Sequence, residues 1–182
     1  MKKFILSTSA FLVLILLVSP LYAKSKKGHK KHSKKAHIAV GYESIVHPVK
    51  LSNTNENRQL LCLADNIYFE GRGESVKGQT EIGYVTIARA KSGLYPDSIC
   101  RVVKQEGQFS WYKKNKRYKI KDPESWKEAL AIARGVRIGV LPNRYKGAMY
   151  FHAKRVRPKW ARHMKLVGAA GNHKFYYKRP RS

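Results

Sequence analysis

Four acidic residues gather in one short stretch of an otherwise basic chain. Asp65, Glu70, Glu74 and Glu81 fall within seventeen positions, whereas the whole chain of 182 residues carries 11 acidic residues against 38 Lys and Arg, a formal net charge of +27. A carboxyl group that keeps its proton near neutral pH can act as a general acid, and two carboxyl groups close together can cleave a glycosidic bond. The cluster therefore predicts acid–base chemistry in this part of the chain.

Glu70 has the most unusual predicted position of these acids. Apolar residues recur at helical spacing from position 58, and Gly71 and Gly73 predict that this helix ends at about Glu70. A carboxylate there faces the negative end of the helix macrodipole, which disfavours the ionised form by about 0.3–1 kcal/mol. We predict Glu70 and Glu74 as catalytic residues, Glu74 as the second carboxyl of a pair or, by preference, as the residue that fixes the turn aiming Glu70. A surface Glu70 paired with Arg72 or a lysine is the alternative.

The remaining pattern predicts a mostly helical α+β domain with a small β element. Further helices are expected to begin near Ser75, over residues 96–98 and at Asp122. The last of these starts is the strongest, because Asp122 is a good N-cap and Pro123 suits the first helical position. Residues 148–152 and 173–177 are predicted as strands that pair or flank a cleft.

Aromatic and hydrogen-bonding side chains alternate in the loop 107–111 and in the strand-like segment 149–153. Flat aromatic faces suit pyranose rings, whereas amide, imidazole and hydroxyl groups can bond sugar hydroxyls. Residues with these properties are predicted to bind substrate: Tyr68, Gln108, Phe109, Ser110, Trp111, Tyr150, His152, Trp160, Asn172 and His173.

The N-terminal segment predicts export to the periplasm or the cell wall. Lys2 and Lys3 precede an apolar run over residues 4–18, and Pro20 and Ala23 follow it, so we predict a signal peptide over residues 1–23. The run is shorter than the about 20 residues of a membrane-spanning helix. No stable membrane span is therefore expected after cleavage, with an uncleaved anchor as the alternative.

Three further segments are predicted after the leader: a basic disordered linker over 24–57, one compact domain over 58–178 and a basic tail over 179–182. Residues 24–37 hold seven Lys and three His, so this stretch is expected to stay unfolded and to bind anionic envelope polymers loosely. Export argues against a nucleic-acid partner. It also permits a Cys62–Cys100 disulfide, with two separate buried thiols as the alternative.

Three ordered motifs span roughly residues 60–177. The first is A-D-N-I-Y-F-E-G-R-G-E with G-Q after it, over residues 64–79. The second is C-R-V-V followed by Q-F-S-W, over residues 100–111, and the third joins Y-F-H-A, V-R-P-K-W and G-N-H-K-F-Y over residues 150–176. In this order the motifs resemble those of the cell-wall hydrolases typified by the spore-cortex-lytic enzyme SleB.

That resemblance implies a lysozyme-like fold, related to the soluble lytic transglycosylases, over residues 58–178. It implies cleavage of peptidoglycan glycan strands between N-acetylmuramic acid and N-acetylglucosamine, with Glu70 as the catalytic acid and no cofactor. Whether the product is a 1,6-anhydro end or a hydrolysed end stays open. The chain departs from the commoner pattern at Gly71, where Ala is usual, and at Ser75, where Pro is frequent.

Two other classes of function compete with this interpretation. One is a zinc N-acetylmuramoyl-L-alanine amidase that uses His152, His163 and His173, but no H-E-x-x-H occurs and no acid follows Glu128 to join these histidines, so no metal site is predicted. The other is a non-catalytic basic module that binds nucleic acid or an anionic wall polymer, and a catalytically inactive relative of the enzymes that only scaffolds the wall machinery also stays open. Charge alone explains salt-dependent binding but no chemistry.

Overall fold

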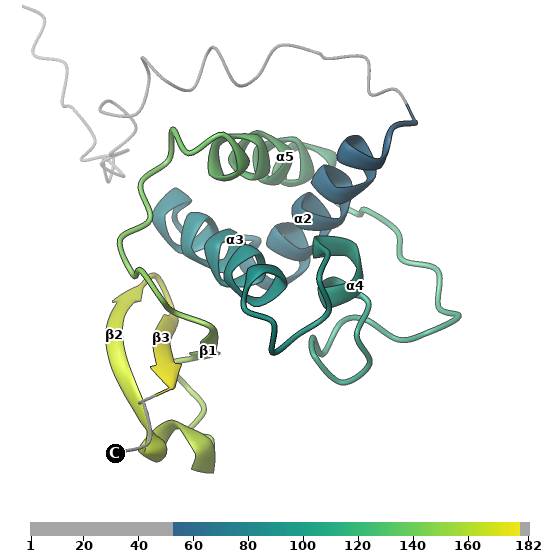
Figure 1. Ribbon diagram of the computed structural model, residues 1–182. Coiled ribbons are helices and arrows are strands. Elements are labelled where there is room, and N and C mark those ends of the chain that lie inside the picture. Colours follow the sequence, from purple (N-terminus) through teal and green to yellow (C-terminus); the bar gives the residue numbers. More distant parts are fainter. Residues whose placement is uncertain (1–52, 179–182) are drawn as a thin grey trace, which may run out of the picture. The chain divides into compact units, whose positions relative to one another are not determined.

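The computed structural model describes residues 53–178, which form helices and a small antiparallel sheet (Figure 1). The four α-helices of this part are α2 (Asn55–Gly71), α3 (Val76–Lys91), α4 (Ile99–Val103) and α5 (Pro123–Arg137). They are followed by β1 (Tyr150–Ala153), the short 3₁₀-helix η2 (Lys159–His163), β2 (Met164–Ala170) and β3 (His173–Lys178). The prediction of an α+β fold is confirmed. The predicted leader 1–23, most of the linker 24–57 and the tail 179–182 lie outside the described residues.

Each α-helix begins after a side chain that caps it. The side chains of Thr54, Ser75, Ser98 and Asp122 each accept a hydrogen bond from a backbone N–H three residues later. The caps of the last three helices fall at the predicted starts. The first helix begins at Asn55, three residues before the predicted domain boundary, because Thr54 supplies a cap there.

The main core forms where α2 packs against α3 and α5. Leu63, Ile67, Ile82 and Ile132 are fully buried at its centre. Helices α2 and α3 approach closely at Gly83, where a Cβ would lie 3.1 Å from the Cδ1 of Ile67. Burial of this apolar surface is the main stabilising term for the helical part.

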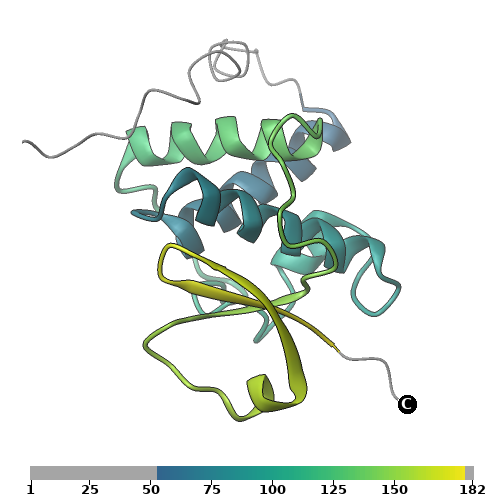
Figure 2. The ribbon, with the colours of Figure 1, turned by 90° about the vertical axis from the view of Figure 1, so that its left-hand side faces the viewer.

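The sheet has the order β1-β3-β2, and Figures 1 and 2 both place it to one side of the helices. Both predicted strand segments form strands, and they pair antiparallel through β1 and β3. Strand β2 was not predicted from the sequence. Its pairing with β3 shifts register between Leu166 and Gly168, and such an irregularity interrupts the alternation of side chains by which a strand is recognised. Gly168 allows the ring of Tyr145 to approach, because a Cβ there would lie 2.1 Å from that ring.

A disulfide between Cys62 and Cys100 joins α2 to α4. Of the two alternatives for these cysteines, the structure therefore has the paired one. Val102 and Val103 of α4 form a second small apolar cluster with Phe109 of the loop that follows. Among residues 53–178, no helix has the length and apolar character needed to cross a membrane.

Candidate active site

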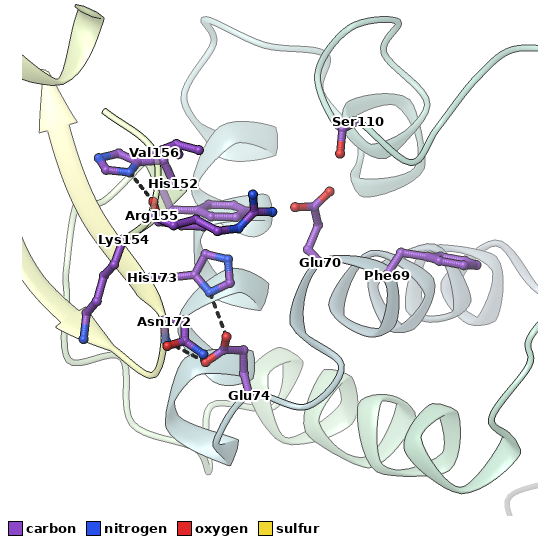
Figure 3. A pocket seen from close by; sticks show the side chains of 12 residues that line it. Phe69, Glu70, Glu74, Ser110, His152, Lys154, Arg155, Val156, Asn172 and His173 are labelled. Carbon is purple, nitrogen blue, oxygen red and sulfur yellow. Dashed lines mark hydrogen bonds and ion pairs between the residues drawn. The ribbon is translucent and has the colours of Figure 1, made fainter. Parts of the chain in front are cut away.

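A cleft of about 1030 Å³ opens between the C-terminal end of α2 and the sheet (Figure 3). Six of the predicted site residues line it: Glu70, Glu74, Ser110, His152, Asn172 and His173. They come from α2 and the turn after it, from the loop that follows α4, from β1, and from the β2–β3 turn and the start of β3. Segments up to about 100 positions apart in the sequence therefore meet at one cleft.

Glu70 extends from the last turn of α2 into this cleft (Figure 3). Burial raises the pKa of its carboxyl group from 4.5 to about 7, while the positive charge of Arg89 opposes the rise. The negative end of the α2 macrodipole also disfavours the carboxylate. At neutral pH a large fraction of the molecules therefore carries a proton on Glu70, as a general acid requires.

The guanidinium group of Arg89 is buried near this acid, with 5% of the residue exposed. Its Nε donates a hydrogen bond to the carbonyl of Met149 at 2.8 Å, and the group lies over the rings of Tyr95 and Phe109. Burial lowers the pKa of Arg89, and Glu70 contributes in the opposite direction. The charge of Arg89 thus limits how far the pKa of Glu70 rises.

Glu74 also lines the cleft, but both of its carboxylate oxygens face partners. Oε2 accepts a hydrogen bond from the backbone N–H of Asn172 at 2.8 Å, and Oε1 lies 3.6 Å from Nδ1 of His173. Burial lowers the pKa of His173. The side chain of Glu74 is only 10% exposed, and a Cβ at Gly171 would lie 1.7 Å from Oε2. This arrangement favours the preferred interpretation of Glu74 as the residue that fixes the turn.

The other two acids of the sequence cluster hold backbone and side chains in place. Asp65 accepts a hydrogen bond from the indole N–H of Trp126 at 2.9 Å. Glu81 is 1% exposed and accepts from the backbone N–H groups of Arg144 at 3.0 Å and Tyr145 at 3.3 Å. Burial raises the pKa of both carboxyl groups. Neither residue lines the cleft.

The loop after α4 is held against α2 by Trp111. Its indole N–H donates to Oδ1 of Asn66 at 3.1 Å, and its ring stacks on Phe69 with 4.4 Å between the centroids. Asn66 is itself buried and donates to the hydroxyl of Thr86 at 3.0 Å. These contacts bring Ser110 to the cleft, where its hydroxyl points toward the Glu70 carboxyl (Figure 3).

The ring of His152 is fixed in the opposite wall. Its Nδ1 lies 2.9 Å from the carbonyl oxygen of Ala153, and its Nε2 lies 2.9 Å from the hydroxyl of Tyr176. A carbonyl can only accept, so Nδ1 carries the proton, and in the neutral ring Nε2 accepts from Tyr176. Residues 53–178 contain no group of three or more His, Cys, Asp or Glu arranged to hold a metal ion.

Two predicted substrate-binding residues lie in the core, and their prediction is corrected here. Tyr68 is 2% exposed, and its hydroxyl accepts hydrogen bonds from the backbone N–H groups of Lys121 and Asp122, which ties the start of α5 to α2. Phe109 is 3% exposed and packs beneath Arg89. Both side chains are therefore structural.

Four other predicted residues lie near the cleft without lining it. Trp111 instead borders a separate hollow of about 300 Å³ together with Tyr112 and Tyr118, and Gln108 is half-buried in the preceding turn. Tyr150 and Trp160 pack against each other at 5.8 Å. For the three aromatic residues among them, a sequence motif does not reveal which face of an element the ring will occupy. Substrate binding by these four residues stays a prediction.

The cleft also contains residues that the sequence analysis missed: Phe69, Phe151, Ala153, Lys154, Arg155 and Val156. Arg155 is the most informative of them, because its guanidinium group points toward the side of the cleft where Glu70 lies (Figure 3). Their position in the sequence could have revealed them, because residues 153–156 directly follow a predicted strand that carries a site residue, His152.

The fold and the cleft together define a small α+β domain in which a carboxyl group of raised pKa faces an open cleft. Residues 73–176, just over half of the chain, match the family model described as Cell Wall Hydrolase. The chain therefore belongs to the Cell Wall Hydrolase family, whose members act on peptidoglycan. The match includes Glu74 and begins three residues after Glu70.

The fold is also similar to a solved structure, described as the crystal structure of the catalytic domain of the Bacillus cereus SleB protein. The TM-score is 0.51 at 20% sequence identity, and the alignment covers 69% of this chain and 94% of that chain. The predicted resemblance to SleB-like cell-wall hydrolases is thereby confirmed at the level of family and fold. Among curated proteins, no sequence matches the chain.

Proposed function

We propose that the protein cleaves the glycan strand of peptidoglycan between N-acetylmuramic acid and N-acetylglucosamine, with Glu70 as the general acid. One observation carries this proposal: in a member of the Cell Wall Hydrolase family, a carboxyl group with a pKa of about 7 faces an open cleft. Ser110, Asn172 and His173 surround the cleft with groups that can bond to sugar hydroxyls and N-acetyl groups.

In the proposed reaction, protonated Glu70 donates its proton to the glycosidic oxygen. The bond to the muramic C1 then breaks, positive charge develops on the ring as in an oxocarbenium ion, and the N-acetylglucosamine end leaves with a free hydroxyl. Glu70, now a carboxylate, removes the proton from the muramic 6-hydroxyl. That oxygen bonds to C1, which gives a 1,6-anhydro end and returns the proton to Glu70.

The intramolecular route is proposed over hydrolysis because of Glu74. It is the other acid among the described residues that line the cleft, and its oxygens face Asn172 and His173. A carboxylate held in this way is poorly placed to act as a nucleophile or to activate a water molecule on the far face of the sugar. A single carboxyl group suffices for the anhydro product.

We further propose that the enzyme acts outside the cytoplasmic membrane, on the periplasmic or wall side. The predicted leader over residues 1–23 is the basis for this proposal, and the Cys62–Cys100 disulfide is compatible with an oxidising compartment. The Lys-rich stretch 24–37 is proposed to hold the enzyme on anionic envelope polymers.

Mass spectrometry of the fragments released from purified peptidoglycan tests the bond and the reaction type together. The proposal predicts fragments with anhydromuramic ends, lighter than hydrolysed fragments by the mass of one water molecule. Fragments with reducing muramic ends would instead show that the enzyme hydrolyses the same bond. Free stem peptides together with intact glycan would instead indicate an amidase and overturn the proposal.

A further inference from the structure

A second hollow, which we call the basic pocket, adjoins the cleft on the connection between β1 and β2. It has a volume of about 670 Å³, within the range of small-ligand sites. Five cationic side chains share its lining: Lys154, Arg157, Lys159, Arg162 and Lys174. No acidic residue is among the described residues that line it.

The positive charge of the basic pocket is not neutralised within the part of the chain that the structure describes. The ion pairs there join Arg101 to Asp97 and Lys127 to Glu124, and Glu74 faces His173. None of these contacts includes a cation of the basic pocket. The sequence explains this, since no acid follows Glu128. Several cations around one hollow repel one another and favour an anion between them.

Four of these cations, all except Lys174 of β3, lie in the connection between β1 and β2, and this connection is packed against the sheet. Trp160, in η2, packs against Tyr150, His152 and Tyr176 with ring centroids 5.8, 5.5 and 5.6 Å apart. Lys159 and Arg162 belong to the same 3₁₀-helix. The aromatic cluster thus holds one side of the basic pocket on the sheet.

The basic pocket is continuous with the cleft that contains Glu70. His152, Lys154 and Val156 line both hollows. Figure 3 shows that two neighbouring side chains diverge at this boundary, since Arg155 points toward Glu70 and Lys154 points away from it. A polymer bound over Glu70 therefore has substituents within reach of the basic pocket.

We propose that the basic pocket binds carboxylate groups of the peptide stems on the same glycan strand that occupies the cleft. This inference rests on the proposed function. Each unmodified muramic residue carries a peptide on its lactyl group, and these peptides bear free carboxylates, which suit Arg and Lys side chains. Continuity with the cleft favours a group attached to the substrate over a separate polymer. The basic pocket would thus select strands that carry peptides.

The test compares two triple variants of the full chain with matched charge loss. One is Arg157→Gln/Lys159→Gln/Arg162→Gln in the basic pocket, and the control is Lys113→Gln/Lys114→Gln/Arg117→Gln in the loop after α4. All six side chains are exposed, so both variants are expected to fold, as circular dichroism can verify. Both also carry Glu70→Gln, which prevents consumption of the substrate.

Binding is measured by co-sedimentation with three kinds of peptidoglycan: untreated, stripped of phosphate polymers, and stripped with its carboxylates then blocked as amides. On stripped peptidoglycan we expect the basic-pocket variant to bind about tenfold more weakly than the control, as about 0.5 kcal/mol for each of three exposed charge contacts implies. Blocking the carboxylates is expected to remove the difference. Equal loss in both variants, or a difference that persists after blocking, would overturn the inference.

Two further outcomes separate the inference from its alternatives. A difference that occurs only on untreated peptidoglycan would assign the basic pocket to phosphate polymers and overturn the inference. The binding measurement does not depend on turnover. A wild-type protein that fails to cleave glycan would therefore contradict the proposed function, while the binding result for the basic pocket would still hold.

Discussion

The carboxylate of Glu74 links the turn after α2 to the turn between β2 and β3, because its Oε2 accepts a hydrogen bond from the backbone N–H of Asn172 at 2.8 Å. Its other oxygen faces Nδ1 of His173 at 3.6 Å. The two turns belong to opposite walls of the cleft. Glu74 thereby joins two walls of the cleft that Glu70 also lines.

Replacing Glu74 tests this positioning role. Glu74→Ala leaves the Asn172 N–H and the buried His173 without their partner, so the free energy of unfolding is expected to fall by about 1–3 kcal/mol. Glu74→Gln keeps an acceptor for Asn172 and is expected to retain most of the stability and part of the activity. Thermal unfolding and the cleavage rate check both. A stable Glu74→Gln as inactive as Glu70→Gln would make Glu74 a second catalytic carboxyl group.

The turn between β2 and β3 is expected to tolerate no side chain at Gly171. Its φ is +54°, and a Cβ would lie 1.7 Å from Oε2 of Glu74. Gly147 is a matched control, since its φ is +80° and no atom lies within 4 Å of the position its Cβ would take. Gly171→Ala should therefore lower the melting temperature more than Gly147→Ala, which adds backbone strain alone. Equal shifts would mean that the approach of Glu74 is unimportant.

The pH dependence of cleavage is expected to follow the carboxyl group of Glu70. Burial raises its pKa to about 7, and the acid must be protonated to donate. Activity should therefore be high below pH 7 and fall as the pH rises through about 7. A profile of kcat/KM against pH checks this. A rate that increases through pH 7 would contradict the role of Glu70 as the acid.

The same raised pKa predicts a change in stability with the opposite sign from that of a salt-bridged acid. The folded state holds the Glu70 proton more tightly than the unfolded chain does. The protonated carboxyl group therefore adds to the free energy of unfolding, fully below pH 4.5 and least above pH 7. Glu70→Gln should therefore be more stable than wild type at pH 8, by about 1–3 kcal/mol. A chemical denaturation series at pH 8 and pH 5 measures the difference, which should shrink at the lower pH.

Arg89 is expected to set the position of that pH profile. Its positive charge lowers the pKa of Glu70 against the effect of burial. Arg89→Met removes the charge and keeps much of the apolar volume, so the alkaline limb should move to higher pH, whereas Arg89→Lys should keep the limb near its place. A limb that moves to lower pH in Arg89→Met would show that the two groups are not coupled as described.

Much of the helical part could be predicted from local signals. The Asp122–Pro123 pair and the Ser75 cap fix helix starts by chemistry within a few residues, which is why these starts agree with the structure. The position of Glu70 in the last turn of its helix was predicted in the same way, because Gly71 and Gly73 end that helix.

The sheet and its aromatic residues depend on contacts that the sequence pattern does not contain. Strand β2 is irregular at Gly168, and its place depends on Tyr145, more than twenty positions away. Tyr68 was assigned to substrate, although its place one helical turn after the buried Ala64 indicated the core. The basic pocket could not be predicted either. The sequence shows that no acid follows Glu128, but it does not show that the cations converge on one hollow.

The rate of glycan cleavage by Glu70→Gln, beside Glu106→Gln as a control for loss of an exposed acid, tests the central claim most directly. Gln is nearly isosteric with Glu but has no proton to donate. We predict that Glu70→Gln loses at least about a hundredfold in rate while it still binds peptidoglycan, and that Glu106→Gln cleaves like the wild type. Glycan cleavage by a folded Glu70→Gln at the wild-type rate would contradict the account.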